Sequence, residues 1–233
     1  MPPALHASRR CRASLAALQN ERSCYYRGMS VGQSKGEQTR QTIISRALEM
    51  VSERGYEGLS IGALAQETQL SKSGLFAHFK SKEALQLGVL QEVINRFTLQ
   101  VVQPALASPR GEPRLRVLFE KKLDWIRGDA ARRGCLLEKA SIEYDNRSGH
   151  PVRERVVQAS RDWLEVLTRS AQAAVDEGHF RADVNVEQFA YEFDGITMMF
   201  QHAHGLMRDR TAAERANTAF ASLLERSRRT RPR

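Results

Sequence analysis

Residues 58–85 read GLSIGALAQETQLSKSGLFAHFKSKEAL, and this stretch predicts two short helices joined by a tight turn. Ser60 and Ser71 each stand just before a helical apolar pattern, where a side-chain oxygen can cap the first turn. Leu64 and Leu75 are expected to face inward. Helices this short bury little surface alone, so they must belong to a larger domain. The small hydrogen-bonding side chains at the start of the second helix suit the floor of a DNA groove.

The second helix carries the residues that we expect to contact DNA. A serine N-cap leaves backbone N–H groups and the positive end of the helix dipole at the helix start, where a phosphate or a base edge is readily accepted. Lys72, Ser73 and Gly74 fall in this first turn, the part of a recognition helix that contacts bases in the major groove. His78 follows on the exposed face, and a DNA contact is favoured for it over a packing role. The pattern therefore indicates a helix-turn-helix that reads DNA.

Length and composition bound the class of protein. The 233 residues allow one large domain or two small ones, and a hydrophobic content of 41% is ordinary for a globular protein. No apolar run approaches the roughly 18 to 20 residues of a membrane-spanning helix, and residues 1–28 lack the apolar segment of a secretory signal. We therefore expect a cytoplasmic protein with no membrane partner. The three cysteines are odd in number and far apart, so neither a disulfide framework nor a metal site is predicted.

The net charge of +9 resembles the footprint of nucleic-acid binding, but its distribution weakens that argument. Residues 1–28 and residues 220–233 each carry a net charge of +4, whereas residues 29–100 carry +1 and residues 101–219 carry none. The excess lies at the two ends of the chain. The prediction of DNA binding therefore depends on the motif and not on the overall charge.

The two ends are expected to lie outside the folded body. Residues 1–28 are rich in Arg, Ala and Ser without a sustained apolar period, so residues 1–35 are interpreted as a disordered extension. A basic arm, a leader peptide and a start codon placed too early all fit this stretch, and the last, with Met29 as the natural start, is favoured. The basic tail at residues 228–233 is interpreted as a solvated end, although such an end can add DNA affinity without specificity.

The body of the chain reads as helix after helix. No alternating β-branched run with a hairpin turn occurs, so the sequence predicts an all-α fold of about nine helices. The first helix carries an apolar stripe at Ile43, Ala47, Leu48 and Val51 and ends at Gly55. A connecting helix begins after Ser81 and is expected to end at Pro104, because proline cannot continue a helix. Its inward positions are Leu85, Val89, Val93, Phe97 and Val101.

Proline and capping residues mark the later helices. Pro113 starts a helix, and its inward stripe is Leu115, Leu118, Phe119, Lys122 and Ile126. After a loop at residues 145–150, Pro151 opens a long helix that closes at Gly178. Asn185 and Thr211 are each followed three residues later by Gln or Glu, which resembles a capping box.

The helix expected over residues 186–206 is apolar on two sides. One side forms a heptad-like seam of Phe189, Phe193, Ile196, Phe200, Ala203 and Met207. The opposite side carries Tyr191, Gly195, Met198 and His202. Such a helix either lies in the middle of a core or packs against a partner. A homodimer interface is favoured, formed by Phe189, Phe193, Ile196, Phe200, Phe220 and Leu223.

The motif as a whole resembles a known family. The sequences TRQTIISRALEMVSERGYEGLS and SIGALAQETQLSKSGLFAHFKSKEALQ are similar to the N-terminal DNA-binding domain of TetR-type (tetracycline-repressor-like) transcriptional regulators. The resemblance covers residues 37–97, and its parts are specific together although each is weak alone. It implies a DNA-binding domain at residues 36–97, with the helix-turn-helix at about 60–79, and a helical regulatory and dimerisation domain at residues 98–227.

The resemblance implies two kinds of contact with DNA. Base or backbone contacts are expected from Lys72, Ser73, Gly74 and His78. Phosphate contacts are expected from Ser60, Ser71 and Lys82. Phe76 stands where the family usually has a tyrosine, so a hydroxyl is missing and the ring is expected to pack against the sugar-phosphate wall. Gln69 replaces the usual glycine of the turn, which costs on the order of 1 kcal/mol if the position is left-handed.

The resemblance also implies an unknown small-molecule effector and no cofactor. Four side chains are candidates for lining its site, namely Trp125, Trp163, Met199 and His202. Aromatic and methionine stripes at helical spacing more often form plain core, so a direct ligand role is the less favoured alternative for each. The implied function is that of a ligand-responsive homodimeric repressor that binds double-stranded DNA at a palindromic operator, with activation as the alternative.

Two other classes of protein compete with this interpretation. An enzyme is disfavoured because the sequence contains no H-E-x-x-H, P-loop, G-x-G-x-x-G or paired E-x-x-H motif. A dimeric scaffold whose helix-turn-helix no longer binds DNA gains support from Phe76 and from the nearly neutral residues 29–100. The combined motif outweighs both, so we expect a bacterial regulator that is associated with the nucleoid when it is bound to DNA.

Overall fold

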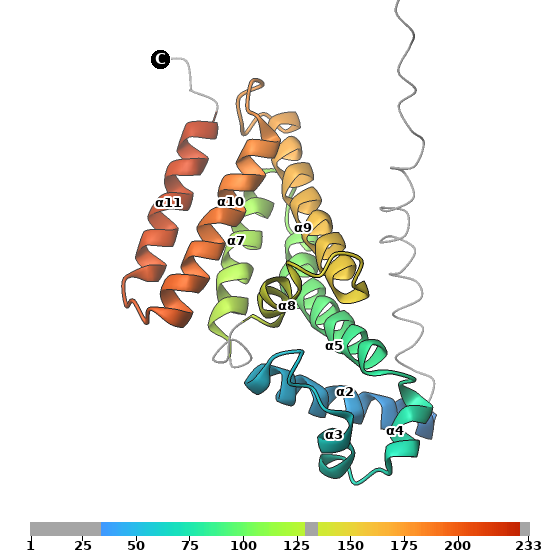
Figure 1. Cartoon of the computed structure of the whole chain (residues 1–233). Helices are drawn as coiled ribbons and strands as arrows, with labels where there is room; N and C mark the ends of the chain where they lie inside the picture. Colours follow the sequence, from blue (N-terminus) through green and yellow to red (C-terminus); the bar gives the residue numbers. More distant parts are fainter. Residues whose placement is uncertain (1–33, 129–134, 229–233) are drawn as a thin grey trace, which may run out of the picture. The chain divides into compact units, whose positions relative to one another are not determined.

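The computed structural model describes residues 34–128 and 135–228, and these residues form nine continuous helical stretches (Figure 1). Within these ranges the only strand-like pairing is an isolated bridge between Phe180 and Arg228. The prediction of an all-α fold with about nine helices is confirmed. The expected disordered extension, except for its last two residues, and the basic tail beyond Arg228 lie outside the described residues.

The predicted helix-turn-helix lies on the second and third helical stretches. The first helices are α2 (Lys35–Arg54), α3 (Ile61–Glu67), α4 (Lys72–His78) and α5 (Lys82–Phe97). The predicted stripe of α2 is buried as expected. Gly55 follows α2 with a φ of 76°, a left-handed conformation that suits glycine at a helix C-terminus. The sequence therefore predicted the end of this helix correctly.

The connecting helix is longer than predicted. A π-helical turn, Thr98–Val102, follows α5 and leads directly into α6 (Gln103–Ala107). The prediction that Pro104 ends the helix is wrong. The backbone N–H of Gln103 donates to the carbonyl of Thr98, five residues earlier, so the hydrogen-bond register changes just before the proline. Pro104 then falls in the first turn of α6, where a missing N–H is tolerated.

The remaining helices are α7 (Glu112–Arg127), α8 (Leu136–Tyr144), α9 (Pro151–Asp176), α10 (Val186–Gln201) and α11 (Ala212–Ser227). A second π-helical turn, His202–Leu206, continues α10. Pro113 lies in the first turn of α7, and α9 begins at the predicted proline and ends just before Gly178, whose φ is 73°. The loop at residues 145–150 separates α8 from α9, as predicted.

The two predicted capping boxes have different outcomes. The side chain of Asn185 accepts a hydrogen bond from the backbone N–H of Gln188, at 2.9 Å, and caps α10 as expected. Thr211 does not cap α11 with its side chain. The Asp209 carboxylate accepts hydrogen bonds from both the backbone N–H and the hydroxyl of Thr211, each at 2.8 Å. A nearby ionised acceptor therefore takes the hydroxyl that the capping box would use.

The buried side chains form two groups. The first lies mainly among α7, α9, α10 and α11, where Phe119 stacks on Phe220 with ring centroids 4.0 Å apart. The second group combines buried residues of α2–α5 with residues of α8 and of the start of α9, including Ala140 and Tyr144. The helix-turn-helix therefore shares its core with α8 and the start of α9. None of the described helices is both long and apolar enough to cross a membrane.

Candidate nucleic-acid interface

Serine caps fix the starts of both helices of the motif. The Ser60 hydroxyl accepts a hydrogen bond from the backbone N–H of Ala63 at 3.4 Å, and the Ser71 hydroxyl accepts one from the N–H of Gly74 at 3.0 Å. On the inner side of the motif, Leu64, Leu75 and Phe79 are buried. These apolar contacts hold α3 and α4 while the opposite face of α4 stays open.

The turn between α3 and α4 contains a backbone outlier. Gln69 has a φ of 56°, which lies in the left-handed region that favours glycine. The Thr68 hydroxyl donates to the carbonyl of Leu64 at 2.7 Å, and the N–H of Leu70 donates to the carbonyl of Ala65 at 3.0 Å. These bonds hold the turn although glutamine is unfavourable in this conformation.

The open face of α4 carries most of the expected contact residues. Ser71, Lys72, Ser73 and Ala77 are exposed, and Gly74 and His78 are half-buried. The Phe76 ring is 46% exposed, which leaves an aromatic face available to the sugar-phosphate backbone.

The starts of α3 and α4 lie close together. A Cβ built onto Gly62 would lie 3.7 Å from Cε of Lys72 and 3.8 Å from the hydroxyl of Ser60. Gly62, which the sequence interpretation did not include, therefore lies between two expected contact residues. The Lys72 side chain lies over this glycine, where an added Cβ would make only ordinary contacts.

Lys82 has partners other than DNA. Its ammonium donates to the backbone carbonyl of Glu57 at 2.7 Å and lies 3.6 Å from the Glu57 carboxylate. The expected phosphate contact must therefore compete with this pair. The structure gives Lys82 a positioning role at the turn before α3.

The turn before α3 is held by the end of α8. The Glu143 carboxylate accepts hydrogen bonds from the backbone N–H groups of Tyr56, at 3.1 Å, and Glu57, at 2.9 Å. The Glu57 carboxylate in turn accepts from the Tyr144 hydroxyl at 2.8 Å and from Arg147 at 2.9 Å. We call these interactions the α8 clamp. No sequence signal could reveal it, because the partners lie 86 to 90 residues apart.

The α8 clamp sets the ionisation of its own groups. The hydrogen bond from Tyr144 is the largest influence on Glu57 and lowers the pKa of its carboxyl; burial opposes this shift, while Lys82 and Arg147 reinforce it. Burial, followed by the bond to Glu57, raises the pKa of the Tyr144 hydroxyl. An ionised Glu57 and a neutral Tyr144 are the forms that the bond requires.

The expected dimer seam lies inside the chain's own core. Its aromatic residues and two residues of α11 are at most 5% exposed, namely Phe189, Phe193, Phe200, Phe220 and Leu223. Ile196 is half-buried and packs against the same core. The prediction that these side chains form the interface is therefore wrong, because α7, α9 and α11 of the same chain already cover them.

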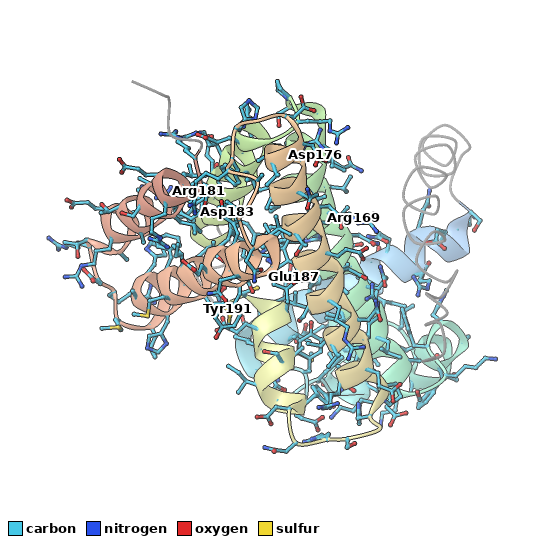
Figure 2. The ribbon with its side chains drawn as sticks, turned by 90° about the horizontal axis from the view of Figure 1, so that it is seen from above. Arg169, Asp176, Arg181, Asp183, Glu187 and Tyr191 are labelled. Carbon is cyan, nitrogen blue, oxygen red and sulfur yellow. The ribbon has the colours of Figure 1, made fainter. Side chains whose placement is uncertain are left out.

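The opposite side of α10 is open instead. Tyr191 is 72% exposed and Met198 is 55% exposed, and a Cβ added at Gly195 would meet no atom within 4 Å. Figure 2 labels Arg169 and Asp176 on α9, Arg181 and Asp183 in the loop that follows it, and Glu187 and Tyr191 on α10. A stripe with two large exposed apolar side chains thus remains on this side of α10.

The four candidate effector residues fall into two groups. Trp125 and Trp163 both make edge-to-face contacts with Phe97, with centroid distances of 5.6 Å and 5.1 Å. Met199 is 55% exposed and His202 is exposed, so neither lies in the core. Sequence reasoning missed Phe97 as a partner of the tryptophans. Among the described residues, no group of three or more His, Cys, Asp or Glu side chains is placed to hold a metal ion.

Two family models match the chain. The model described as "Bacterial regulatory proteins, tetR family" matches residues 43–89, and the model described as "Tetracyclin repressor-like, C-terminal domain" matches residues 111–220. The first match contains the helix-turn-helix, and the second contains α7, α8, α9 and α10 and the first part of α11.

Known proteins show the same similarity. The transcriptional repressor DhaR of Mycobacterium sp. strain GP1 is 25% identical over 148 residues, which cover 62% of this chain and 71% of DhaR. The transcriptional activator FasR of Mycolicibacterium smegmatis is 30% identical over 94 residues, 40% of this chain and 43% of FasR. The crystal structure of a TetR transcriptional regulator from Chloroflexus aurantiacus has a TM-score of 0.75 at 23% identity and covers 84% of this chain and 99% of its own.

Proposed function

Because the chain belongs to the TetR family of transcriptional regulators, we propose that it is a homodimeric repressor that binds a palindromic operator through α4 and releases it when a small effector binds. Its family consists of DNA-binding regulators and not of enzymes. Such a protein acts on the bacterial nucleoid. We place the DNA-binding domain at residues 36–97 and the regulatory and dimerisation domain at residues 98–227.

The observation that carries the proposal is the open face of α4. Leu75 and Phe79 anchor the helix in the core while Ser71, Lys72 and Ser73 remain exposed at its first turn. A helix that enters the major groove contacts base edges with this first turn. Lys72 supplies a cation for a guanine edge or a phosphate, and the two serine hydroxyls donate to either.

Dimerisation supplies a second copy of the helix-turn-helix. Tyr191, Gly195, Met198 and His202 form an open stripe along α10, with spacings of four, three and four residues. A twofold axis would place this stripe against its own copy, with α11 beside it, in a four-helix arrangement. A single DNA-binding domain with a net charge near zero binds DNA weakly, so the pairing of two such domains matters for affinity.

The α8 clamp offers a route from the effector to DNA. It joins α8 of the regulatory domain to the turn that precedes α3. An effector that binds more tightly when α8 is displaced would shift the population of dimers toward that conformation. In it the two copies of α4 would no longer match the spacing of the operator half-sites. Repression is favoured over activation by the longer match to DhaR, although FasR is an activator.

Selection of bound duplexes from a random pool, followed by sequencing, tests the proposal. We expect enrichment of an inverted repeat whose half-sites lie about one helical turn apart or a multiple of it. Fluorescence anisotropy then gives the affinity for the selected duplex and for a scrambled duplex. Equal affinity for the two duplexes would favour a scaffold without DNA-reading function.

A further inference from the structure

An aromatic and charged cluster lies between the two buried cores. It contains Phe97 at the end of α5, Lys122 and Trp125 on α7, Glu138 on α8 and Trp163 on α9. The Lys122 ammonium lies 4.8 Å from the ring centroid of Phe97 and 5.3 Å from that of Trp163. Trp125 packs against both cores. We call these five residues the Lys122 cluster.

The Lys122 ammonium has unused hydrogen-bonding capacity. It is half-buried and its contacts are with ring faces; no oxygen of a described residue accepts a hydrogen bond from it. Neighbouring Lys121 differs, because its ammonium lies 3.5 Å from the Asp124 carboxylate. A cation over aromatic faces is attracted by the rings but keeps its three N–H donors. The cluster therefore presents a donor that fits an anionic group.

The acidic side chains of the region do not accept a hydrogen bond from Lys122. The Asp194 carboxylate accepts a hydrogen bond from the Trp163 indole at 2.8 Å and another from the Thr197 hydroxyl at 3.3 Å. Burial raises the pKa of the Glu138 carboxyl, and the nearby charges of Lys122 and His202 only partly offset this effect. Burial thus disfavours the charged form of Glu138, the form that would compete with a bound anion for Lys122.

Backbone geometry marks the same place independently. Phe97 is the residue directly before the π-helical turn Thr98–Val102. His202, whose charge acts on Glu138, begins the second π-helical turn. Single π-helical turns inside α-helices are rare and occur frequently at functional sites.

We propose that the Lys122 cluster is the effector site and that it takes a small amphipathic carboxylate. The carboxylate of the ligand pairs with the Lys122 ammonium, and its apolar body lies against Phe97, Trp125 and Trp163. Binding to the cluster is independent of DNA, whereas its effect on DNA rests on the proposed function. The path from this site to the helix-turn-helix is short, because one helix, α8, carries Glu138 near its start and the clamp residues Glu143 and Tyr144 at its end.

The two tryptophans make the binding test direct. They are the only tryptophans in the chain, and both belong to the cluster, so intrinsic fluorescence reports on it. The full-length protein is titrated with butanoate, octanoate and phenylacetate and with the matched alcohols 1-butanol, 1-octanol and 2-phenylethanol. We expect at least one carboxylate to give a saturable change with a Kd about tenfold or more below that of its alcohol. If no carboxylate binds more tightly than its alcohol, the proposal is wrong.

Three variants locate the site. Lys122→Met should weaken carboxylate binding about tenfold or more, whereas the matched control Lys121→Met should leave it unchanged. Glu138→Gln should keep or tighten binding, because it removes the residual negative charge. Circular dichroism and thermal unfolding establish that each variant is folded. Equal effects of Lys122→Met and Lys121→Met, or loss of binding in Glu138→Gln, would overturn the assignment.

The DNA effect is measured separately. Anisotropy with the selected duplex should show release by the carboxylate that binds wild-type protein, with a concentration dependence that follows the fluorescence titration. A protein that binds the carboxylate but no duplex would retain the site and contradict the proposed function. A protein that binds the duplex but none of the carboxylates would contradict the site alone.

Discussion

Gln69 illustrates how the motif holds a conformation that its own residue disfavours. A left-handed conformation costs a residue with a Cβ about 1 to 2 kcal/mol. The side chain of Gln69 is exposed, and the turn is held by the hydroxyl of Thr68 and by the backbone N–H groups of Gln69 and Leu70. The geometry between α3 and α4 is thus imposed by the two anchored helices.

Replacing Gln69 by glycine should stabilise the protein. The strain of the positive φ is removed, while the added flexibility of the unfolded chain offsets part of the gain, so we expect an increase of about 0.5 to 1 kcal/mol in the free energy of unfolding. Urea denaturation measures it. The control Gln66→Gly, inside α3, should lower the free energy of unfolding by about 1 kcal/mol. A loss of stability in Gln69→Gly would contradict the strain.

Lys72→Ala and His78→Ala should weaken binding to the selected operator. A lost base contact costs about 1 to 3 kcal/mol, and a lost phosphate contact weakens binding to all duplexes alike. Anisotropy with the selected and the scrambled duplex distinguishes the two cases. Lys121→Ala, on α7, is the control and should bind as wild type does. Unchanged binding in both Lys72→Ala and His78→Ala would remove these residues from the interface.

At the scale of elements, α8 links the motif to the rest of the fold. Its last residues hold the turn before α3 through a carboxylate that accepts two backbone N–H groups, and Lys139 donates to the carbonyl of Ser52 at 2.7 Å. Bonds to ionised groups are stronger than neutral ones. The position of α3 and α4 therefore depends on α8 as well as on the connecting helix α5.

The contribution of Glu57 to stability should depend on pH. Its pKa is lowered in the folded protein from an ordinary value of 4.5, so its stabilising effect is complete above that value and is lost as the pH falls through the folded pKa. The difference in unfolding free energy between wild type and Glu57→Gln should therefore be present at neutral pH and shrink in acid. Urea denaturation across this range tests it. Glu67→Gln, at an exposed position of α3, should show no such trend.

At the scale of the whole molecule, function depends on which side of α10 is free. The aromatic seam of α10 is buried in the chain's own core. The exposed stripe consists of Tyr191, Gly195, Met198 and His202. Exposed apolar side chains in a row are unfavourable in water unless a partner covers them. The proposed homodimer would cover this stripe.

Substitutions on the two sides of α10 should have different effects. Met198→Glu should convert dimers to monomers with little loss of secondary structure, because it places a charge in the proposed interface. Phe193→Glu should unfold the protein, since an unpaired charge buried in the core costs several kcal/mol. Sedimentation velocity and circular dichroism separate the two results. Ile142→Glu, at an exposed position of α8, is the control. A Met198→Glu protein that still sediments as a dimer would contradict the interface.

Local signals were enough to predict most of the helices. Gly55, Pro113, Pro151 and Asn185 act through their own backbone or through neighbours within four residues, and each lies where the sequence placed it. The failure at Pro104 has a local cause that periodicity does not contain, namely a wider helical turn just before it.

The site was less predictable, because its contacts are distant in sequence. The expected DNA-contacting residues stay predictions; the α8 clamp was missed because nothing near Glu57 indicates Glu143 or Tyr144. One signal was present but unused. Lys122 is the only charged residue in the apolar stripe of α7, and a charge on an apolar face indicates a special environment. The seam of α10 was misassigned because an apolar face does not reveal which neighbour covers it.

The π-helical turn at Thr98–Val102 has a consequence for chain length. Each such turn contains one residue more than an α-helical turn requires, and one residue rotates an α-helix by about 100°. The turn can therefore lose one residue without changing which way Val93 and Ala105 face. Deleting exposed Gln100 should give an uninterrupted α-helix on the same two buried positions, whereas a deletion inside α5 would rotate all that follows. The connecting helix thus contains a position where the chain can lose one residue, a single codon, without rotating the helices on either side.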